Sequence, residues 1–193
     1  MKRILTWLGA CLTALSLTGC GYNSIQSADE AVKAAHAQVL SVYQKRADLI
    51  PNIVEVVKAE ASFEKTTLEA VVNARAKATQ VTLPANATEA EAKAFMEAQK
   101  AVGSGLARLL VVAESYPQLK ANAGFKDLRR QLEEVESQAT AVRNKYIRSI
   151  QAYNGLVRKF PVNLTAAVFG YEKKAQVQFE DEAALRKAPQ VKF

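Results

Sequence analysis

The residue types that most often carry out chemistry are scarce in this chain. His36 is the only histidine, and Cys11 and Cys20 are the only cysteines. A di-iron helical bundle needs two Glu-x-x-His pairs, but Lys33 stands three residues before His36. A Ser-His-Asp triad would have to use His36, and the Gly-x-Ser-x-Gly turn of many hydrolases is missing. We therefore predict that His36 flanks a helix seam, and we predict no catalytic residue, metal or cofactor.

Acidic side chains gather in one stretch, at Glu133, Glu134 and Glu136. The helical pattern around them places all three on an outward face, which indicates a solvated charge cluster. Hydrolysis by paired carboxylates remains the alternative, although the pattern does not predict a cleft.

Gly103 and Gly105 lie inside a helical pattern, where each glycine costs ~1 kcal/mol of helix propensity. A phosphate-binding loop would need a preceding strand and a following Gly-Lys-Ser/Thr sequence, and both are missing. We instead predict a close contact between helices here.

Amino-acid composition and net charge indicate which classes of binding partner suit this chain. The 193 residues are 49% hydrophobic, which is enough for one domain with a real core. With 26 Lys and Arg against 19 Asp and Glu the net charge is +7, and without Lys2 and Arg3 it is +5. This excess suits an anionic lipid surface, but it is too small to predict a nucleic-acid partner.

The first twenty residues have the features of an export signal. Lys2 and Arg3 precede an apolar run over 4–17, which is shorter than the ~20 residues that span a bilayer. The run ends in Leu17-Thr18-Gly19-Cys20, which resembles the lipobox of bacterial lipoproteins. The resemblance implies removal of residues 1–19 and attachment of a diacylglycerol with acyl chains such as palmitate to the Cys20 sulfur. A plain membrane-anchoring helix with an incidental cysteine is the alternative. In a Gram-negative cell, Gly21 rather than Asp after the cysteine favours the periplasmic face of the outer membrane.

Apolar positions at alternating spacings of three and four predict long amphipathic helices with coiled-coil-like seams. The longest pattern covers 122–160 and holds about five heptads. With short connections, these helices imply an all-α, antiparallel up-and-down four-helix bundle with long helices after the N-terminal signal segment. The predicted helices cover 24–47, 48–80, 88–116 and 122–160, with Thr88 and Glu91 as a capping box for the third and Asn122 as a cap for the fourth.

Pro51 marks the predicted turn between the first two helices. A proline inside a helix removes a backbone hydrogen bond and clashes with the preceding turn. One interpretation is a kink within a single long helix. The favoured one is a tight turn, with Asp48 capping a new helix and Pro51 in its first turn.

Charged side chains fall on or beside the helix seams at Arg46, Asp48, Glu64 and Arg75. They predict either long side chains that extend past the core to solvent or a buried polar network that fixes helix register.

Several separate motifs resemble the LemA family and occur in order from about residue 22 to the end. The family is known for an antiparallel four-helix bundle, a membrane-bound N-terminus and no established enzymatic activity, so the resemblance implies these properties. The lipobox-like segment departs from the family's usual transmembrane helix. The matching stretches are Arg46-x-Asp48-Leu49-Ile50-Pro51-Asn52-Ile53-Val54, Glu64-x-x-x-Leu68-x-x-Val71-x-x-Ala74-Arg75, Tyr116-Pro117-x-Leu119-Lys120-Ala121-Asn122, Tyr153-Asn154, Phe160-Pro161-x-Asn163-Leu164 and Ala188-Pro189-x-Val191-x-Phe193.

Positive charge concentrates near the end of the predicted fourth helix. No acidic residue lies between Glu136 and Glu172. In an up-and-down bundle this helix ends where the first begins, so we predict a basic, membrane-facing end. The apolar segment 160–171 either rests on the bilayer or only caps the bundle. The predicted membrane contacts are Arg143, Lys145, Arg148, Arg158 and Lys159.

The last residues, 171–193, form a predicted tail beyond a bundle over 20–170. Val191 and Phe193 before a free carboxylate suit capture by a partner's sheet edge. A frayed or bundle-packed terminus is the alternative.

Together these patterns predict a bacterial, lipid-anchored, non-enzymatic bundle that acts as a scaffold or adaptor for another cell-envelope protein. The alternative is a bundle that carries a lipid or peptide, which a cavity beside Gly103 and Gly105 would favour. An enzyme comes third and would need a metal or a carboxylate pair in a cleft.

Overall fold

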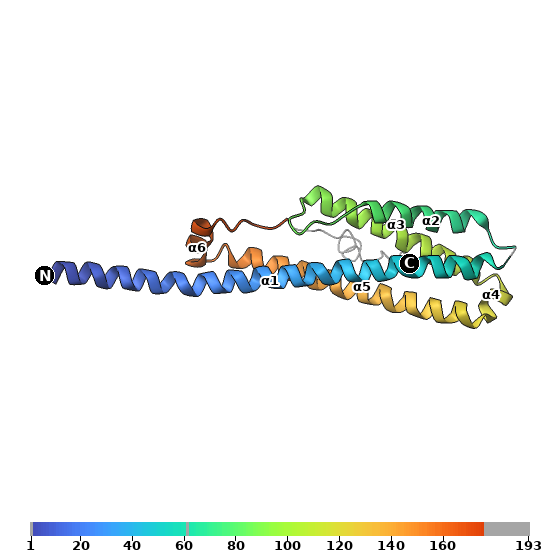
Figure 1. Cartoon of the computed structure of the whole chain (residues 1–193), viewed down its shortest axis with the longest axis horizontal. Helices are drawn as coiled ribbons and strands as arrows, with labels where there is room; N and C mark the ends of the chain where they lie inside the picture. The colour runs from blue at the N-terminus through green and yellow to red at the C-terminus, as the bar shows by residue number, and fades with distance from the viewer. Residues whose placement is uncertain (1, 61, 176–193) are drawn as a thin grey trace, which may run out of the picture. The chain divides into compact units, whose positions relative to one another are not determined.

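The computed structural model describes the backbone of residues 2–60 and 62–175 and the side chains of residues 21–60 and 62–175. Every regular element within these residues is an α-helix, so the predicted all-α fold is confirmed. The helices in Figure 1 are α1 (Lys2–Lys58), α2 (Lys65–Gln80), α3 (Glu89–Ala113), α4 (Pro117–Ala121), α5 (Ala123–Leu156) and α6 (Val162–Phe169).

Helix α1 continues through Pro51, so the tight turn predicted at Asp48 and Pro51 was wrong. Proline lacks the N–H that would bond to the carbonyl four residues earlier, which here belongs to Ala47. The Nε of Arg75 on α2 lies 2.9 Å from that oxygen and donates to it. The carbonyl therefore keeps a donor, and the helix tolerates the proline.

Instead α1 ends at Lys58 and α2 begins at Lys65, so the helix predicted over 48–80 is divided between two helices. Phe63 is buried in this connection, with its ring centroid 5.0 Å from that of Tyr116. Glu64 follows, and its carboxylate accepts hydrogen bonds from Thr66 and Thr67 at 2.7 and 2.8 Å. These two bonds lower the pKa of Glu64 and order the first turn of α2.

Helix α3 begins as predicted. The Glu91 amide donates to Thr88 Oγ1 and the Thr88 amide donates to Glu91 Oε2, which completes the capping box. The close contact predicted at Gly105 is confirmed, because a Cβ there would lie 3.4 Å from Val71 Cγ2 and 3.6 Å from Val71 Cα. This spacing allows α2 and α3 to approach each other.

Helix α5 is shorter than the predicted 122–160, although Asn122 caps it by accepting from the Phe125 amide at 3.0 Å. Most positions of its heptad pattern up to Tyr146 are buried, with Leu128 and Val142 half-buried, but then Ile150 is buried rather than Ser149, the next position of the pattern. A helix turn of 3.6 residues drifts from a strict heptad, which accounts for this shift. Phe160 lies beyond the end of the helix and is 79% exposed.

The chain divides into two compact units, and α1 and α5 contribute to both. Unit 1 comprises residues 1–41 and 139–175, and unit 2 contains residues 42–138. Unit 2 holds one hydrophobic core, which α1, α2, α3 and α5 line together (Figure 1). Its most deeply buried side chains are Ile50, Ile53, Val57, Val71, Leu109, Leu132 and Val135. In unit 1, Val32 of α1, Tyr153 of α5 and Ala166 of α6 are buried.

Candidate functional site

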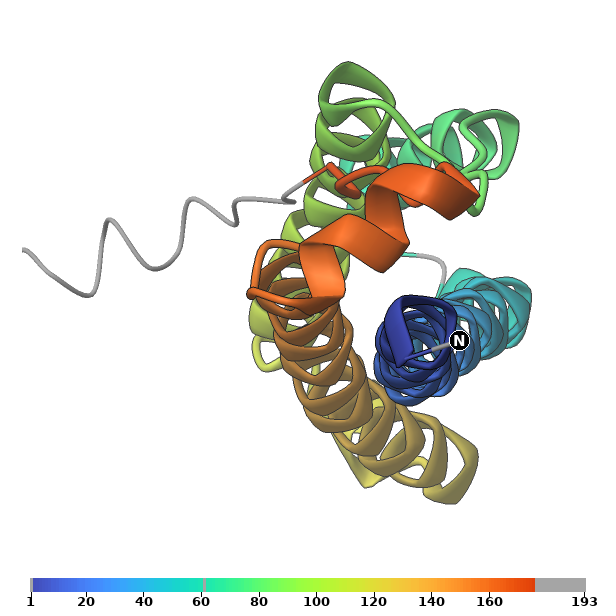
Figure 2. The ribbon, with the colours of Figure 1, turned by 90° about the vertical axis from the view of Figure 1, so that its left-hand side faces the viewer.

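Helix α6 packs against the residue that follows Cys20. A Cβ at Gly21 would lie 3.0 Å from Thr165 Oγ1 and 3.7 Å from Val162 Cα, so even alanine would require the Thr165 side chain to shift by a few tenths of an ångström. Gly21 and Thr165 are both buried. Figure 2 shows α6 in orange, running crosswise to α1 and α5. The packing of α6 on α1 therefore extends to the residue directly after Cys20.

Aromatic contacts extend this packing. The Tyr22 ring centroid lies 5.0 Å from that of Phe169 and 6.3 Å from that of Tyr171. The Tyr171 hydroxyl also donates to Gln26 Oε1 at 2.8 Å. These contacts hold the end of α6 on α1.

The segment after α6 is held against α5 by hydrogen bonds from Tyr153 and Asn154, which form one of the LemA-like sequence motifs. Gly170, with φ of 71°, ends α6 in the left-handed conformation. The Asn154 side chain then donates to Lys174 O at 2.8 Å and accepts from the Lys174 amide at 2.9 Å. The Tyr153 hydroxyl donates to Glu172 O at 3.1 Å. Burial and the nearby Asp29 charge raise the pKa of Tyr153, which keeps this donor protonated.

An ion pair ties the same segment to α1. Lys174 Nζ lies 2.8 Å from Asp29 Oδ1, and Lys33 Nζ lies 2.9 Å from Asp29 Oδ2. Burial raises the pKa of Asp29, but hydrogen bonds from both lysines outweigh it and hold the pKa below its usual value. Asp29 therefore stays ionised and fixes Lys174.

Four apolar side chains on α6 or directly before it are exposed. Phe160, Leu164, Val168 and Phe169, which we call the α6 face, are 79%, 58%, 80% and 57% exposed. Leu164 and Val168 are four residues apart within α6, the spacing that places side chains on one side of a helix, and Phe160 lies in the connection before it.

Net charge is distributed unevenly between the units. Over 21–41 and 139–175, unit 1 has eight Lys and Arg against three Asp and Glu, a net charge of +5. Residues 42–138 of unit 2 have thirteen of each and are neutral. The positive excess therefore lies in the unit that carries the α6 face.

The five cations predicted as membrane contacts do not gather at one place. Arg143 and Lys145 lie on α5 about 20 Å before its end, at ~1.5 Å per residue. Arg143 is half-buried, and Lys145 donates to Gln38 at 3.0 Å. Arg148 is exposed on α5. Only Arg158 and Lys159, both exposed in the connection between α5 and α6, directly precede the α6 face.

The structure also separates the four residues predicted as one polar network. Asp48 accepts from Gln44 at 2.8 Å, and Arg75 donates to Ala47 O. Glu64 accepts from the hydroxyls of Thr66 and Thr67, and its Oε1 lies 3.8 Å from Arg108 Nη2. Among the four, only the Arg46 side chain is deeply buried, at 3% exposed.

Arg46 has its own network with two residues that the sequence did not assign to it. It donates to Glu136 at 2.9 Å, to Gln99 O at 2.9 Å and to the Gln99 side chain. Its guanidinium also lies 4.8 Å from the centre of the Tyr43 ring. Gly103 leaves space here, since a Cβ would lie 3.6 Å from Arg46 Nη1. Glu136 is thus an ion-pair partner rather than part of a purely solvated cluster, and the polar Gln99 on an otherwise apolar seam was the available signal.

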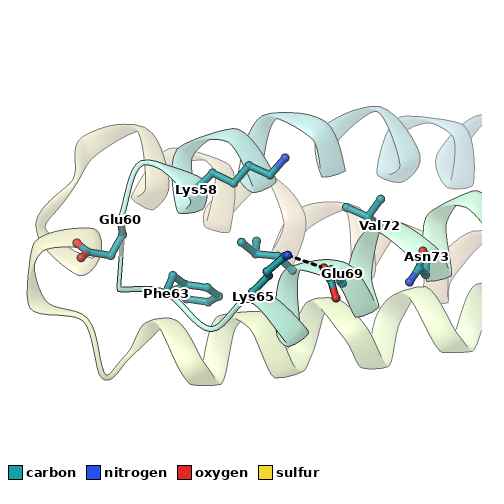
Figure 3. A pocket seen from close by; sticks show the side chains of 8 residues that line it. Lys58, Glu60, Phe63, Lys65, Glu69, Val72 and Asn73 are labelled. Atoms are coloured by element: carbon teal, nitrogen blue, oxygen red, sulfur yellow. Dashed lines mark ion pairs between the residues drawn. The ribbon is translucent and has the colours of Figure 1, made fainter.

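Unit 2 contains a pocket of about 380 Å³ between the end of α1 and the start of α2 (Figure 3). Phe63, Leu68 and Val72 supply its apolar lining, and Lys58 and Lys65 supply cations. Gly103 and Gly105 do not line it. We predicted that a cavity beside Gly103 and Gly105 would favour a bundle that carries a ligand. This pocket lies elsewhere and is not that cavity.

The described residues lack two other features, a metal site and a membrane-spanning helix. No group of three or more His, Cys, Asp or Glu is arranged to hold a metal ion there. Within the same residues, no helix combines the length and hydropathy needed to cross a bilayer.

Comparison with known proteins identifies the family. The model of the LemA family matches residues 35–193, most of the chain. The protein belongs to the LemA family. The LemA match includes all of unit 2, α6 and the Tyr153-Asn154 motif, and it begins after Gly21 and Tyr22.

Curated relatives match a smaller part of this LemA protein. Magnetosome proteins MamQ 1 and MamQ 2 of Paramagnetospirillum magneticum are each 29% identical over 86 residues, which is 45% of this chain and 32% of theirs. Magnetosome protein MamQ of Magnetospirillum gryphiswaldense is 26% identical over 81 residues, or 42% of this chain and 30% of its own. The chain thus spans about a third of the length of these relatives.

Some predicted site residues lie outside the described part of this LemA chain. The side chains of Cys11 and Cys20 are not described, and neither are Val191 and Phe193. The predicted lipid attachment and the predicted contact through the tail remain predictions.

Proposed function

We propose that this LemA protein is a lipid-anchored, non-enzymatic scaffold or adaptor of the bacterial cell envelope. In this proposal residues 1–19 are removed as a signal peptide, and the Cys20 sulfur carries a diacylglycerol. Residues 20–170 act as an antiparallel four-helix bundle that presents its surface, or the tail over 171–193, to an envelope protein. A Gram-negative host would place it on the periplasmic face of the outer membrane.

The observation that carries this proposal is the packing of Gly21 against α6. Because a Cβ at Gly21 would lie 3.0 Å from Thr165 Oγ1, the fold reaches to within one residue of Cys20. A lipid on Cys20 would leave almost no free linker, so unit 1 would be held against the bilayer. Such fixed placement suits a scaffold, which must present its partner at a defined distance from the membrane.

The core of unit 2 supports the bundle arrangement. Four long helices contribute to one hydrophobic cluster, and α4 is a short connection before α5. Two nitrogens of the buried Arg46 side chain, Nη1 and Nη2, have structural partners in Glu136 and Gln99. This use of the buried polar groups favours a structural role over catalysis.

The anchor is tested by labelling cells with a palmitate analogue. We expect the wild-type chain and Cys11→Ser to incorporate it, and Cys20→Ser to lose both the label and stable membrane association. Labelling that persists in Cys20→Ser would contradict the lipid anchor.

The adaptor role is tested by crosslinking in native membranes, capture and mass spectrometry. The full chain is compared with a chain that lacks Val191, Lys192 and Phe193. A reproducible envelope partner supports the adaptor role, and its loss on truncation assigns the contact to the tail. Absence of a partner from both forms would contradict it.

The pocket beside Phe63 favours one alternative, a bundle that carries a small lipid or peptide. Its volume of about 380 Å³ lies within the range of ligand sites. Val72→Trp would fill the pocket from α2, whereas Val111→Trp alters an exposed position on α3. Loss of a co-purified ligand only in Val72→Trp would support the alternative.

A further inference from the structure

We propose that the α6 face, made of Phe160, Leu164, Val168 and Phe169, is a second membrane contact that inserts into the interface of an anionic phospholipid bilayer. This inference rests on the proposed lipid anchor, because the anchor determines which surface lies near the bilayer. It adds a direct contact between protein side chains and lipid.

The first argument is the exposure of apolar side chains. More than half of each of the four side chains is exposed, whereas Thr165 and Ala166 of α6 are buried. In residues 42–138, only Val72 and Val111 are large hydrophobic residues in the exposed class, and they lie on different helices. Contiguous exposed apolar side chains mark an interaction surface, while single ones are normal.

The second argument is charge. Arg158 and Lys159 are exposed directly before the α6 face. No acidic residue lies between Glu136 and Glu172 in the sequence, so the face itself carries no negative charge. Asp29 nearby is already paired with Lys33 and Lys174. Apolar side chains flanked by cations are the combination that amphipathic helices use on anionic lipid.

The third argument is position and orientation. Gly21 packs on Thr165, so α6 lies beside the residue that would carry the lipid. Helix α6 has eight residues and is only ~12 Å long. It runs crosswise to α1 (Figure 2), so it would lie in the plane of a bilayer into which α1 points.

The experiment uses the mature lipidated chain, which begins at Cys20, with one introduced cysteine. A polarity-sensitive dye is attached to the introduced cysteine. The test variant is Val168→Cys on α6, and the matched control is Val111→Cys on α3; both valines are exposed. The proteins are reconstituted into phosphatidylcholine vesicles, with or without phosphatidylglycerol, that contain brominated lipid. We expect the dye at position 168 to be quenched severalfold more than the dye at position 111, most strongly with phosphatidylglycerol. Equal quenching at the two positions would overturn the proposal.

Two additions separate the possible failures. The chain without an introduced cysteine should not take up dye, because a lipidated Cys20 has no free thiol; uptake would refute the anchor, independently of quenching at position 168. Adding Arg158→Gln and Lys159→Gln to Val168→Cys should remove the dependence on phosphatidylglycerol. If the dye at position 168 is shielded in native membranes but not in vesicles, a protein covers α6 and the lipid contact is wrong.

Discussion

Arg75 Nε and Ala47 O are joined by a 2.9 Å hydrogen bond that compensates for Pro51. In a regular helix the Ala47 carbonyl would accept from the N–H of residue 51, which proline lacks. Arg75 belongs to α2 and Ala47 to α1, 28 positions earlier. Two separate LemA motifs are thus explained by one contact, which also connects the helices across the core of unit 2.

We expect Arg75→Met to lower the free energy of unfolding by about 1–3 kcal/mol, because the carbonyl loses its donor. In a Pro51→Ala background the cost should be clearly smaller, since the restored N–H can bond to Ala47 O. Urea unfolding of the four proteins in this double-mutant cycle measures the coupling. An equal cost in both backgrounds would show that Arg75 does not compensate for the proline.

The Arg46 network should matter more for stability than nearby surface charge. We expect Arg46→Met to cost about 3 kcal/mol of unfolding free energy, because buried Gln99 loses its donor. Lys45→Met alters the exposed neighbour and should cost less than about 0.5 kcal/mol. Glu136→Gln should cost about 1 kcal/mol or less, because the Glu136 side chain is 43% exposed. Thermal and urea unfolding test this order, and equal losses for Arg46→Met and Lys45→Met would contradict it.

Gly21 should control the packing of α6. In Gly21→Val the new side chain would displace Thr165, so the amides of Val162–Phe169 should exchange with deuterium faster. Gly155→Ala is the matched control, because a Cβ there has no neighbour within 4 Å. Unchanged protection of α6 in Gly21→Val would show that the two helices do not depend on this contact.

The Asp29 ion pairs should make unit 1 sensitive to acid. The folded state lowers the pKa of Asp29, so its contribution to stability is fully present above the unfolded pKa of about 3.9. It is lost as pH falls through the lower, folded pKa. The difference in unfolding free energy between wild type and Asp29→Asn should therefore be largest near neutral pH and vanish in strong acid. Glu30→Gln is the control, because the Glu30 side chain is 64% exposed, and its unfolding free energy should differ less from that of wild type. If Asp29→Asn and Glu30→Gln show the same pH dependence of unfolding free energy, the prediction is contradicted.

Local signals in the sequence located several elements correctly. The Thr88–Glu91 capping box, the Asn122 cap and the Gly105 contact each depend on residues close in sequence or on one small side chain. The turn between α1 and α2 was misplaced because Pro51 is tolerated through a donor from another helix. Helix propensity alone contains no information about such a distant donor.

The candidate site was only partly predictable for the same reason. The apolar and basic character of the region near Phe160 is visible in the sequence, and so is the Tyr153-Asn154 motif. Other contacts of the site join residues far apart in the sequence, so they become visible only in the tertiary structure. They are the contacts of Lys174 with Asn154 and Asp29, and the packing of Gly21 on Thr165. The five cations predicted as membrane contacts do not lie together, because Arg143, Lys145 and Arg148 are spread along α5 and Arg158 and Lys159 follow its end.

The most direct test of the account is the intact mass of the mature protein purified from membranes, with fragmentation at its N-terminus. We expect a chain that begins at Cys20 and carries a diacylglycerol on the sulfur. A chain that retains Met1, or one that has a free Cys20 thiol, would contradict the lipid anchor on which the proposed function depends.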